Sequence, residues 1–570
     1  MDVRQSNTIA TFKNEVVASK GVVAANHPLA SLAGVEMLAR GGNAFDAAVA
    51  SLFALTVVEP MMVSMFGAGF FVYRDAESGE IETLDNYAVA PKAATEDMYT
   101  PVDVRQPGQG LFETVDCSNM VGRRAVATPG NLKAWEHVVE EYGELSFEEV
   151  ISPAVMLARK GYRASEYLAY VVGLMESDIA SFPETAAAFL PGGRAISAGD
   201  AVVMPDYAET LEEVAEKGSG HLYGGRLGRA VVDDMAENGG LLAMKDLLDY
   251  KLIPRKPIKG TYRDRFEICS MPPGSSGGTH IIQMLNMLEH FDVAAMGFAS
   301  VEYVHLYAEV LKIAFADRQM YMGDPSRVEV PVEGLTSKEY AAERVKEIGD
   351  TAAMRSPGRP SLYRGDSGNT THVSAMDSEG NMVAATQTLN GFFGSKVMAP
   401  GTGMLLNNCM ALFDPRPGRA NSVAGGKRML SSMSPTIVLR RGEPFMCLGG
   451  TGGIRIFPEV CRAIVNVVDF GMSIQQAVEA PLVWTMGIPG TPGEKLHLES
   501  QYYEKMLGPL RSRGHDPLIL PKIGGNMNGV LWDSETKLIH GGACWRADGS
   551  PAGLSGGPSH PNARKRGPPV

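Results

Sequence analysis

The sequence predicts an α+β fold in which helix-rich and strand-rich segments are largely separate along the chain. Helical periodicity dominates residues 28–58 and most of 130–250, whereas short runs after residue 370 alternate apolar and polar side chains. The 570 residues are 45% hydrophobic and 21% charged, a composition typical of a globular protein. We expect a single continuous body, because large enzymes of mixed structure often exceed the usual domain length.

The N-terminal segment predicts two consecutive helices and a hairpin. Leu32, Val35 and Leu38 recur at helical spacing, and a Gly-Gly-Asn stop follows, with Asn43 as the expected N-cap of the second helix. Residues 69–74 and 81–86 then alternate in polarity around a Ser-Gly turn, which indicates a β-hairpin.

The middle and the end of the chain differ in character. A strand and a Pro/Gly turn over residues 266–280 precede a long helix expected at 301–321. Residues 326–369 are polar and weakly periodic, which predicts a linker leading into the strand-rich last third. The Gly/Pro-rich tail from about residue 550 is expected to be partly disordered.

Composition and charge exclude several classes of function. The formal net charge is −13 without a strongly basic segment in the body of the chain, which argues against a nucleic-acid partner. The longest apolar run, residues 47–58, is too short for a membrane span. The six cysteines are scattered and lack metal-ligand spacing, so we expect unpaired thiols rather than disulfides or a zinc site. No secretory signal is visible, and we expect a cytoplasmic location. We also expect no metal or organic cofactor.

A second predicted hairpin brings reactive side chains together. Gly380 fits the left-handed last position of a three-residue loop that closes on Asp377 and Asn381. The register that follows places Thr370 opposite Thr388, with residue 390 just beyond.

A threonine hydroxyl needs a neighbouring base to act as a nucleophile, and the free α-amine of an N-terminal threonine is one such base. That chemistry requires cleavage between Asn369 and Thr370. Thr388 would orient the Thr370 hydroxyl. The hairpin alone favours the simpler interpretation, an ordinary strand that carries exposed hydroxyl groups.

Two further clusters suit acyl-transfer chemistry. Ser431 and Ser432 precede a predicted strand, and Gly452 and Gly453 follow one, where a Gly-Gly turn exposes backbone N–H groups suited to an oxyanion hole. A phosphate-binding loop is the rival interpretation, but the run lacks the Gly-Lys-Ser/Thr ending and the dinucleotide glycine spacing.

Taken together, these segments resemble the γ-glutamyltranspeptidase family of Ntn-hydrolases. The matching motifs occur in family order through most of the chain: Ala-Asn-His-Pro (25–28), Gly-Gly-Asn-Ala-Phe-Asp-Ala-Ala (41–48), Met-Pro-Pro-Gly-Ser-Ser-Gly-Gly (271–278), Phe-Ala-Asp-Arg (315–318), Gly-Asp-Pro (323–325), Asn-Thr-Thr-His (369–372), Leu-Leu-Asn-Asn (405–408), Leu-Ser-Ser-Met-Ser-Pro-Thr (430–436) and Gly-Gly (452–453).

The resemblance implies a four-layer αββα sandwich made by a precursor that cleaves itself into two subunits that stay together. Residues 1–369 would form the large subunit, with 326–369 as its linker, and residues 370–570 the small one. It further implies roles for single side chains: nucleophile Thr370, its hydroxyl partner Thr388, oxyanion donors Gly452 and Gly453, and substrate contacts Asn390, Ser431 and Ser432.

The substrate-binding positions depart from the family pattern. Where glutathione-cleaving members hold the substrate α-carboxylate with an arginine and its α-amine with a glutamine and an acidic residue, this chain has Tyr87, Cys409 and Leu412. An unpaired zwitterionic head group is costly to bury, although Asp414 is a candidate replacement. The departures suggest an acyl group other than γ-glutamyl, such as the glutaryl groups cut by cephalosporin acylases similar to this family, or a small oxo-acid.

Two alternatives remain open at the level of sequence. Residues 274–278 match the Gly-x-Ser-x-Gly pattern of serine hydrolases, without an accompanying Asp/His order. A non-catalytic relative that serves as a scaffold is the second alternative, and the altered head-group positions favour it.

Overall fold

A computed structural model describes residues 9–102, 113–327, 329–353, 369–488, 494–499 and 504–561. Within these residues a 13-stranded sheet has the order β6-β3-β2-β10-β9-β1-β17-β16-β12-β11-β8-β7, and β18 pairs with β1 beside this path. The bounds are β1 Glu15–Ala25, β2 Ala68–Arg74, β3 Ile81–Asn86, β6 Ile253–Arg255, β7 Ile258–Tyr262, β8 Phe266–Ser270, β9 Asn369–Asp377, β10 Met382–Asn390, β11 Thr436–Arg440, β12 Glu443–Gly450, β16 Met527–Asp533, β17 Leu538–Ala543 and β18 Ser550–Ser559.

The sheet curls so that its two halves face each other. Strand β9 contacts β12 and β16, and β10 contacts β12, although these strands are not neighbours in the strand order. Between the halves lies a buried apolar layer that includes Val22, Ala24, Met376, Cys447 and Val530. Helices cover the opposite face of each half of the sheet. Both faces of these strands are therefore covered, one by the other half of the sheet and one by helices.

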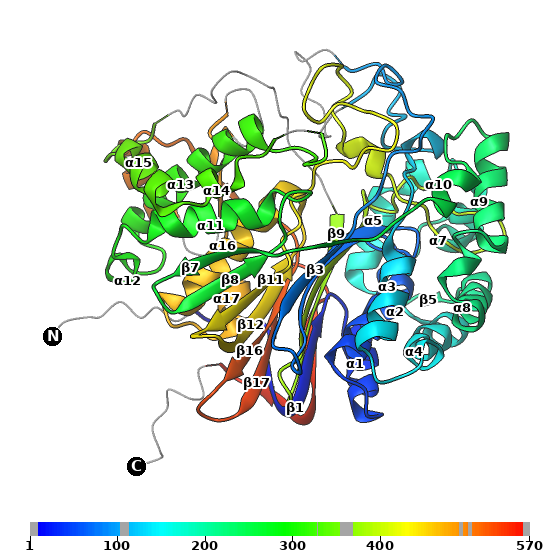
Figure 1. Cartoon of the computed structure of the whole chain (residues 1–570), viewed down its shortest axis with the longest axis horizontal. Coiled ribbons are helices and arrows are strands. Elements are labelled where there is room, and N and C mark those ends of the chain that lie inside the picture. The colour runs from blue at the N-terminus through cyan, green and yellow to red at the C-terminus, as the bar shows by residue number, and fades with distance from the viewer. Residues whose placement is uncertain are drawn as a thin grey trace.

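The first helical layer covers β1, β2, β3, β9 and β10 (Figure 1). Phe53 and Trp135 pack edge to face in its core, and Asn43 caps α2 by accepting hydrogen bonds from the N–H groups of Phe45 and Asp46, as predicted. The helices on this side are α1 Pro28–Ala39, α2 Ala44–Val58, α3 Asn131–Tyr142, α4 Phe147–Lys160, α5 Glu166–Leu174, α6 Glu176–Ile179, α7 Pro183–Phe189, α8 Pro205–Lys217, α9 Arg226–Glu237 and α10 Met244–Leu248.

The second helical layer covers β7, β8, β11 and β12 on the other side of the sheet (Figure 1). Phe315 packs against Phe457 in its core, and the long helix α13 has the predicted bounds. The helices of this layer are α11 Gly277–Leu288, α12 Val293–Met296, α13 Val301–Tyr321, α14 Val332–Leu335, α15 Lys338–Arg344, α16 Ile456–Val468, α17 Ile474–Glu479 and α19 Leu507–Ser512. Two small sheets complete the fold: β4 Tyr162–Arg163 with β5 Ala201–Val202, and β13 Val483–Trp484, β14 Leu496–Glu499 and β15 Pro517–Leu520.

The hairpin of β9 and β10 forms as predicted over most of its length. Gly380 has φ 98°, and the Asp377 carboxylate accepts hydrogen bonds from the N–H groups of Glu379, Gly380 and Asn381, which closes the turn. The predicted register holds as far as the pair of Thr371 and Gln387.

The register departs from the prediction at the far end of the hairpin. An irregularity follows Gln387, and Asn390 pairs with Asn369. Thr370 and Thr388 are therefore not a regular cross-strand pair, because a β-bulge adds a residue to one strand.

Strands from before and after residue 370 alternate across the sheet. β9 lies between β10 and β1, while β2 pairs with β10 and β8 pairs with β11. A break of the chain before β9 would therefore leave the two parts hydrogen-bonded to each other through five strand pairs of the described residues: β1 with β9, β17 and β18, β2 with β10, and β8 with β11.

Two expectations about irregular segments need correction. The linker expected at 326–369 begins with helices α14 and α15, and its residues 354–368 lie outside the described residues. The tail from about residue 550 was expected to be partly disordered; its residues 550–559 instead form β18, which pairs with β1, and residues 562–570 lie outside the described residues. Pro551 and Pro558 are tolerated because β18 lies beside the main strand path, where missing N–H donors cost little.

The cysteines agree with the expectation of free thiols. All six cysteines are unpaired, and five of them are buried. No helix among the described residues combines the length and the apolar character needed to cross a membrane.

Candidate active site

A pocket lies at the start of β9, where the curled sheet meets the second helical layer. Thr370, only 3% exposed, lies at its wall. Strand β10, helix α13 and the loops before β11 and α16 supply most of the remaining wall. The lining residues are Tyr87, Arg318, Thr370, Thr388, Asn390, Leu412, Leu430, Ser431, Ser432, Met433, Gly453 and Ile456. Eight of the ten catalytic and substrate-binding positions predicted from sequence thus meet at one place, and Gly452 and Cys409 are the two that are absent from this wall.

The end of β10 is held in an unusual conformation. Asn390 has φ 78°, and its backbone N–H donates a 2.7 Å hydrogen bond to Thr388 Oγ1. The Asn390 side-chain amide donates to the backbone oxygen of Asn408 at 3.1 Å. These contacts stabilise the left-handed backbone that an asparagine tolerates better than most residues. The bulge keeps Thr388 and Asn390 beside Thr370 even though the regular register ends before them.

The Gly-Gly turn follows β12 and leads into α16, as predicted. Gly452 has φ 118° and Gly453 has φ 62°, which are conformations that residues with side chains avoid. A Cβ at Gly452 would lie 2.8 Å from the Gly525 nitrogen. Because Gly453 lines the pocket and begins the helical turn, the backbone N–H groups here are suited to stabilise a developing oxyanion.

Ser431 and Ser432 are positioned by the turn before α11. The Ser431 N–H donates to the Gly274 oxygen at 3.2 Å, and the Ser431 oxygen accepts hydrogen bonds from the N–H and the hydroxyl of Ser276 at 2.9 and 3.0 Å. Two buried loops that lie far apart in sequence therefore fix the serine segment. Both serines are nearly buried and line the pocket.

The same contacts argue against a serine-hydrolase site at residues 274–278. The Ser276 hydroxyl accepts from Arg318 Nε and donates to a backbone oxygen, so it is held as a structural group. The nearest histidine in sequence, His280, bonds to Gln283, and burial lowers its pKa to about 3. Neither residue has the geometry of an activated nucleophile and its base.

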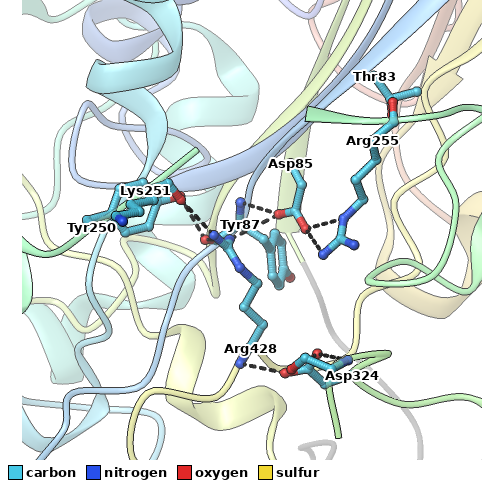
Figure 2. A network of polar contacts seen from close by, with 9 residues as sticks. Thr83, Asp85, Tyr87, Tyr250, Lys251, Arg255, Asp324 and Arg428 are labelled. Carbon is cyan, nitrogen blue, oxygen red and sulfur yellow. Dashed lines mark hydrogen bonds and ion pairs between the residues drawn. The ribbon is translucent and has the colours of Figure 1, made fainter. Parts of the chain in front are cut away.

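Tyr87 takes the position where the resemblance places a carboxylate-binding arginine. Its ring stacks on Phe70 at 4.8 Å, and its N–H donates to Asp85 Oδ1 at 2.9 Å. Figure 2 shows two arginines around it, and both are paired with Asp85: Arg255 Nε at 2.8 Å and Arg428 Nη1 at 3.0 Å. Neither arginine lines the pocket, so the network fixes Tyr87 without replacing the missing charge.

The positions expected to hold an α-ammonium group are apolar. Leu412 lines the pocket, while Cys409 is fully buried outside its wall, and burial raises the pKa of this thiol. Asp414, the candidate replacement, accepts from Arg416 Nε at 2.8 Å and Nη2 at 2.7 Å, and it does not line the pocket. The described wall therefore contains no carboxylate.

Two residues that were not predicted from sequence contribute to the site. Arg318 lines the pocket, although sequence alone identified it only as part of a family motif. Glu59 lies at the end of the apolar run in α2. It accepts a 2.6 Å hydrogen bond from Oγ1 of Thr371, the residue directly after the predicted nucleophile. Burial raises the pKa of Glu59 to about 8. No sequence signal connected residue 59 with residue 371.

A group of possible metal ligands lies elsewhere. Among the described residues, His305, Glu309 and His515 are close enough to hold an ion. His305 Nδ1 is 2.8 Å from His515 Nε2, and Lys312 Nζ donates to Glu309 at 2.7 Å. These residues satisfy one another, and none of them lines the Thr370 pocket.

Known proteins resemble the chain over nearly its whole length. The family model for gamma-glutamyltranspeptidase matches residues 30–554. The chain is 46% identical to the acylase ACY 1 proenzyme of Pseudomonas sp. (strain V22), over 97% of each protein. It is 36% identical to the glutathione hydrolase proenzyme of Escherichia coli (strain K12), over 90% of this chain and 88% of that protein.

Solved structures agree with this similarity. The crystal structure of cephalosporin acylase from Bacillus halodurans superposes with a TM-score of 0.85 at 29% identity, and the alignment covers 97% of this chain and 99% of that one. Since the family model spans most of the chain and full-length relatives exceed 30% identity, this chain belongs to the γ-glutamyltranspeptidase family.

Proposed function

We propose that the chain, an amide hydrolase and acyltransferase of this family, matures by cutting itself before Thr370 and then uses Thr370 as its nucleophile. The observation that carries the proposal is the position of Thr370 at the start of β9, in one pocket with Thr388, Asn390 and Gly453. The proenzyme names of the relatives support the maturation step.

The cleavage step requires only this chain and a water molecule. Thr370 Oγ attacks the carbonyl carbon of Asn369, the C–N bond breaks, and an ester joins the two parts. Water then hydrolyses the ester, which releases the carboxyl group of Asn369 and the α-amine of Thr370. The alternation of strands across the sheet favours subunits of 369 and 201 residues that stay together as one four-layer αββα body.

The mature site then works by acyl transfer. The α-amine of Thr370 takes the hydroxyl proton while the oxygen attacks the substrate amide, and the N–H groups of the Gly452–Gly453 turn stabilise the oxyanion. Collapse of this intermediate passes the proton to the leaving amine and forms an ester on Thr370. Water or a second amine takes the acyl group and regenerates the enzyme.

The pocket favours an acyl group that carries a carboxylate without an α-ammonium group. Leu412 replaces the acidic partner of the amine, and Asp414 is neutralised by Arg416. A γ-glutamyl head group would bury an unpaired ammonium there, which is unfavourable. Glutaryl-type amides fit this description, and small oxo-acid amides such as oxamate are the second candidate class.

Matched anilide substrates test this function. Glutaryl-p-nitroanilide is expected to exceed γ-glutamyl-p-nitroanilide in kcat/KM by about tenfold or more, because an unpaired buried charge costs about 1–3 kcal/mol or more. Rapid acid quench followed by intact mass spectrometry should show a glutaryl adduct on the fragment that begins at Thr370. A clear preference for the γ-glutamyl substrate would reject the proposed acyl class, and absence of any adduct would reject the acyl-enzyme.

A further inference from the structure

The loop before β16 packs against the start of the oxyanion turn, residues 452–453. Regular pairing of β12 with β16 ends at Gly450 and Met527. The next residues along the two strands, Thr451 and Asn526, are joined by two further hydrogen bonds. The Thr451 N–H donates to the Asn526 oxygen at 2.9 Å, and the Asn526 N–H donates to Thr451 Oγ1 at 2.7 Å. The residue directly before the turn is therefore held by its backbone and by its side chain.

The second of these bonds ends the strand pair. Two residues that face each other in this way normally exchange both backbone N–H···O bonds. Here the Thr451 hydroxyl, rather than its backbone oxygen, accepts the Asn526 N–H. A side chain that takes over a backbone partner competes with the regular ladder. The chain can then leave β12 with φ 118° at Gly452 and bring Gly453 to the pocket wall.

The packing around this contact leaves it little room to shift. A Cβ at Gly525 would lie 2.0 Å from Thr451 Oγ1, and a Cβ at Gly452 would lie 2.8 Å from the Gly525 nitrogen. Thr451 and Asn526 are both almost completely buried. Loss of the hydroxyl would therefore leave a buried N–H without its partner, which is costly unless the two segments move apart.

The loop that carries Asn526 is itself anchored. The Ile523 N–H donates to Glu499 Oε1 at 2.8 Å. Glu499 forms an ion pair with Arg546, whose Nε donates to Glu499 Oε1 at 2.8 Å, and both side chains are almost completely buried. A loop fixed in this way sets the position of Thr451, and through it the place where the oxyanion turn begins.

We propose that Thr451 is a positioning residue, whose hydroxyl holds the N–H groups of the oxyanion turn in place through its bond to the Asn526 N–H. This inference rests on the proposed function, since it concerns the acyl-transfer step at Thr370. Thr451 is absent from the described pocket wall, so it acts through the turn and not on the substrate. Preorganised oxyanion donors act mainly in the transition state, so a displaced turn should lower kcat more than it raises KM.

Thr451→Val tests the proposal, because it replaces the hydroxyl by a methyl group of similar size. With glutaryl-p-nitroanilide, kcat is expected to fall by about 10- to 100-fold, while KM stays within about threefold of wild type. Thr451→Ser keeps the acceptor and should recover most of the rate. Unchanged kcat in Thr451→Val, or equal losses in the valine and serine variants, would overturn the proposal.

Inhibitor binding separates positioning from a purely structural role. 4-Boronobutanoate mimics the tetrahedral intermediate: Thr370 Oγ bonds to boron while its proton passes to the α-amine, and a boronate oxygen takes the place of the oxyanion. Glutarate has the same length but stays planar at the reacting carbon. Thr451→Val should weaken boronate binding by about 10- to 100-fold and change glutarate binding by about threefold at most. Equal weakening of both inhibitors would overturn the proposal.

Thr402 offers a matched control for the loss of a buried threonine hydroxyl. Its Oγ1 accepts the Met404 N–H at 3.1 Å and donates to the Ala399 oxygen at 2.8 Å, and it does not line the pocket. Thr402→Val is expected to keep the wild-type kcat and the wild-type ratio of the two inhibition constants. A loss of kcat as large as that in Thr451→Val would contradict the proposal.

Two measurements keep the proposal testable if Thr451→Val does not fold. Thr451→Ala is a second variant without the hydroxyl, and it should show the same split between the two inhibitors. In the wild-type protein, 4-boronobutanoate should slow amide hydrogen exchange in residues 450–455 and 524–527 together, because the hydrogen bond between Thr451 and Asn526 joins these segments. Slowing confined to residues 450–455 would overturn the proposal.

Failure of this inference is distinguishable from failure of the proposed function. The oxyanion turn acts on the carbonyl group that all amide substrates share. The fold-loss in kcat caused by Thr451→Val should therefore be the same for the glutaryl and γ-glutamyl anilides, whichever the wild-type protein prefers. The wild-type adduct and the wild-type preference decide the acyl-enzyme and the acyl class, and the Thr451 variants decide the role of Thr451.

Discussion

The hydroxyl of Thr371 donates a 2.6 Å hydrogen bond to Glu59 Oε2, which joins β9, the strand that carries the proposed nucleophile Thr370, to the end of helix α2. Asn26 Nδ2 lies 3.5 Å from the other oxygen of the same carboxyl group. Glu59 is almost completely buried, and loss of solvation raises its pKa to about 8. The raised pKa favours the protonated form of the carboxyl group that accepts the Thr371 hydrogen bond near the start of β9.

The raised pKa of Glu59 predicts a pH-dependent stability. The group binds a proton more tightly in the folded chain than in the unfolded chain, where a glutamate has its ordinary pKa of 4.5. Its stabilising contribution is complete below about pH 4.5 and is lost as the pH rises through about 8, at up to about 1.4 kcal/mol per pH unit. The free energy of unfolding, measured by urea denaturation of wild type and Glu59→Gln at pH 5, 7 and 9, tests this prediction.

The free energy of unfolding of Glu59→Gln should depend less on pH than that of wild type, because glutamine does not titrate. Glu459 is the appropriate control, because its pKa is also raised to about 8 by burial, and it does not line the Thr370 pocket. Glu459→Gln should therefore leave the contribution of Glu59 in place. If the free energy of unfolding changed with pH in the same way in wild type and Glu59→Gln, the raised pKa of Glu59 would be contradicted.

The Thr388 hydroxyl is expected to matter for catalysis through the backbone that it holds. Thr388→Val removes the acceptor for the Asn390 N–H, so the left-handed turn at Asn390 loses a stabilising contact. We expect kcat to fall roughly 10- to 100-fold, with a smaller change in KM. Thr388→Ser keeps the hydroxyl and should recover most of the rate; equal losses in both variants would contradict the assignment of the effect to the hydroxyl group alone.

The left-handed glycine turn predicts a sharp sensitivity to small side chains. Gly452→Ala places a Cβ 2.8 Å from the Gly525 nitrogen at φ 118°, so the turn must shift. Displacement of the oxyanion donors should lower kcat by about 100-fold or more. Gly442→Ala, at φ 84° with open space around its Cβ, is a control for backbone strain alone and should retain the rate. The rate of p-nitroaniline release in a single turnover, measured for Gly452→Ala and Gly442→Ala, checks this prediction.

Restoring the family head-group partners should redirect the substrate preference. The double variant Tyr87→Arg with Leu412→Asp adds a cation and a carboxylate at two positions that line the pocket. The ratio of kcat/KM for γ-glutamyl over glutaryl anilide is expected to rise by about tenfold or more, as the buried ammonium gains a partner. The reverse-charge control, Tyr87→Asp with Leu412→Arg, should not raise this kcat/KM ratio.

Local sequence signals predicted the parts of the fold that short-range interactions control. Gly380 and the alternation around it gave the hairpin register as far as Gln387, and Asn43 marked the start of α2. The bulge before Asn390 was not predictable, because it depends on contacts with Asn408 that only the folded chain provides. Residues 550–559 were misjudged from their Gly/Pro content, since pairing with β1 overrides local preference.

The same limit applies to the site. The hydroxyl-bearing residues and Gly453, which line the pocket, were predicted from sequence, because their residue types suit the proposed chemistry. Arg318 and Glu59 were missed as site residues, because their relevance depends on which helix ends the curled sheet brings to the start of β9. Composition and spacing carry no information on such long-range contacts.

The most direct test of the whole account is the integrity of the chain itself. Purified wild-type protein on a denaturing gel should give two fragments of 369 and 201 residues, and Edman sequencing of the smaller one should begin Thr-Thr-His-Val. Thr370→Ala should remain a single band of 570 residues and lack activity. A wild-type chain that stays intact after prolonged incubation, or a Thr370→Ala chain cut at the same bond, would contradict the account.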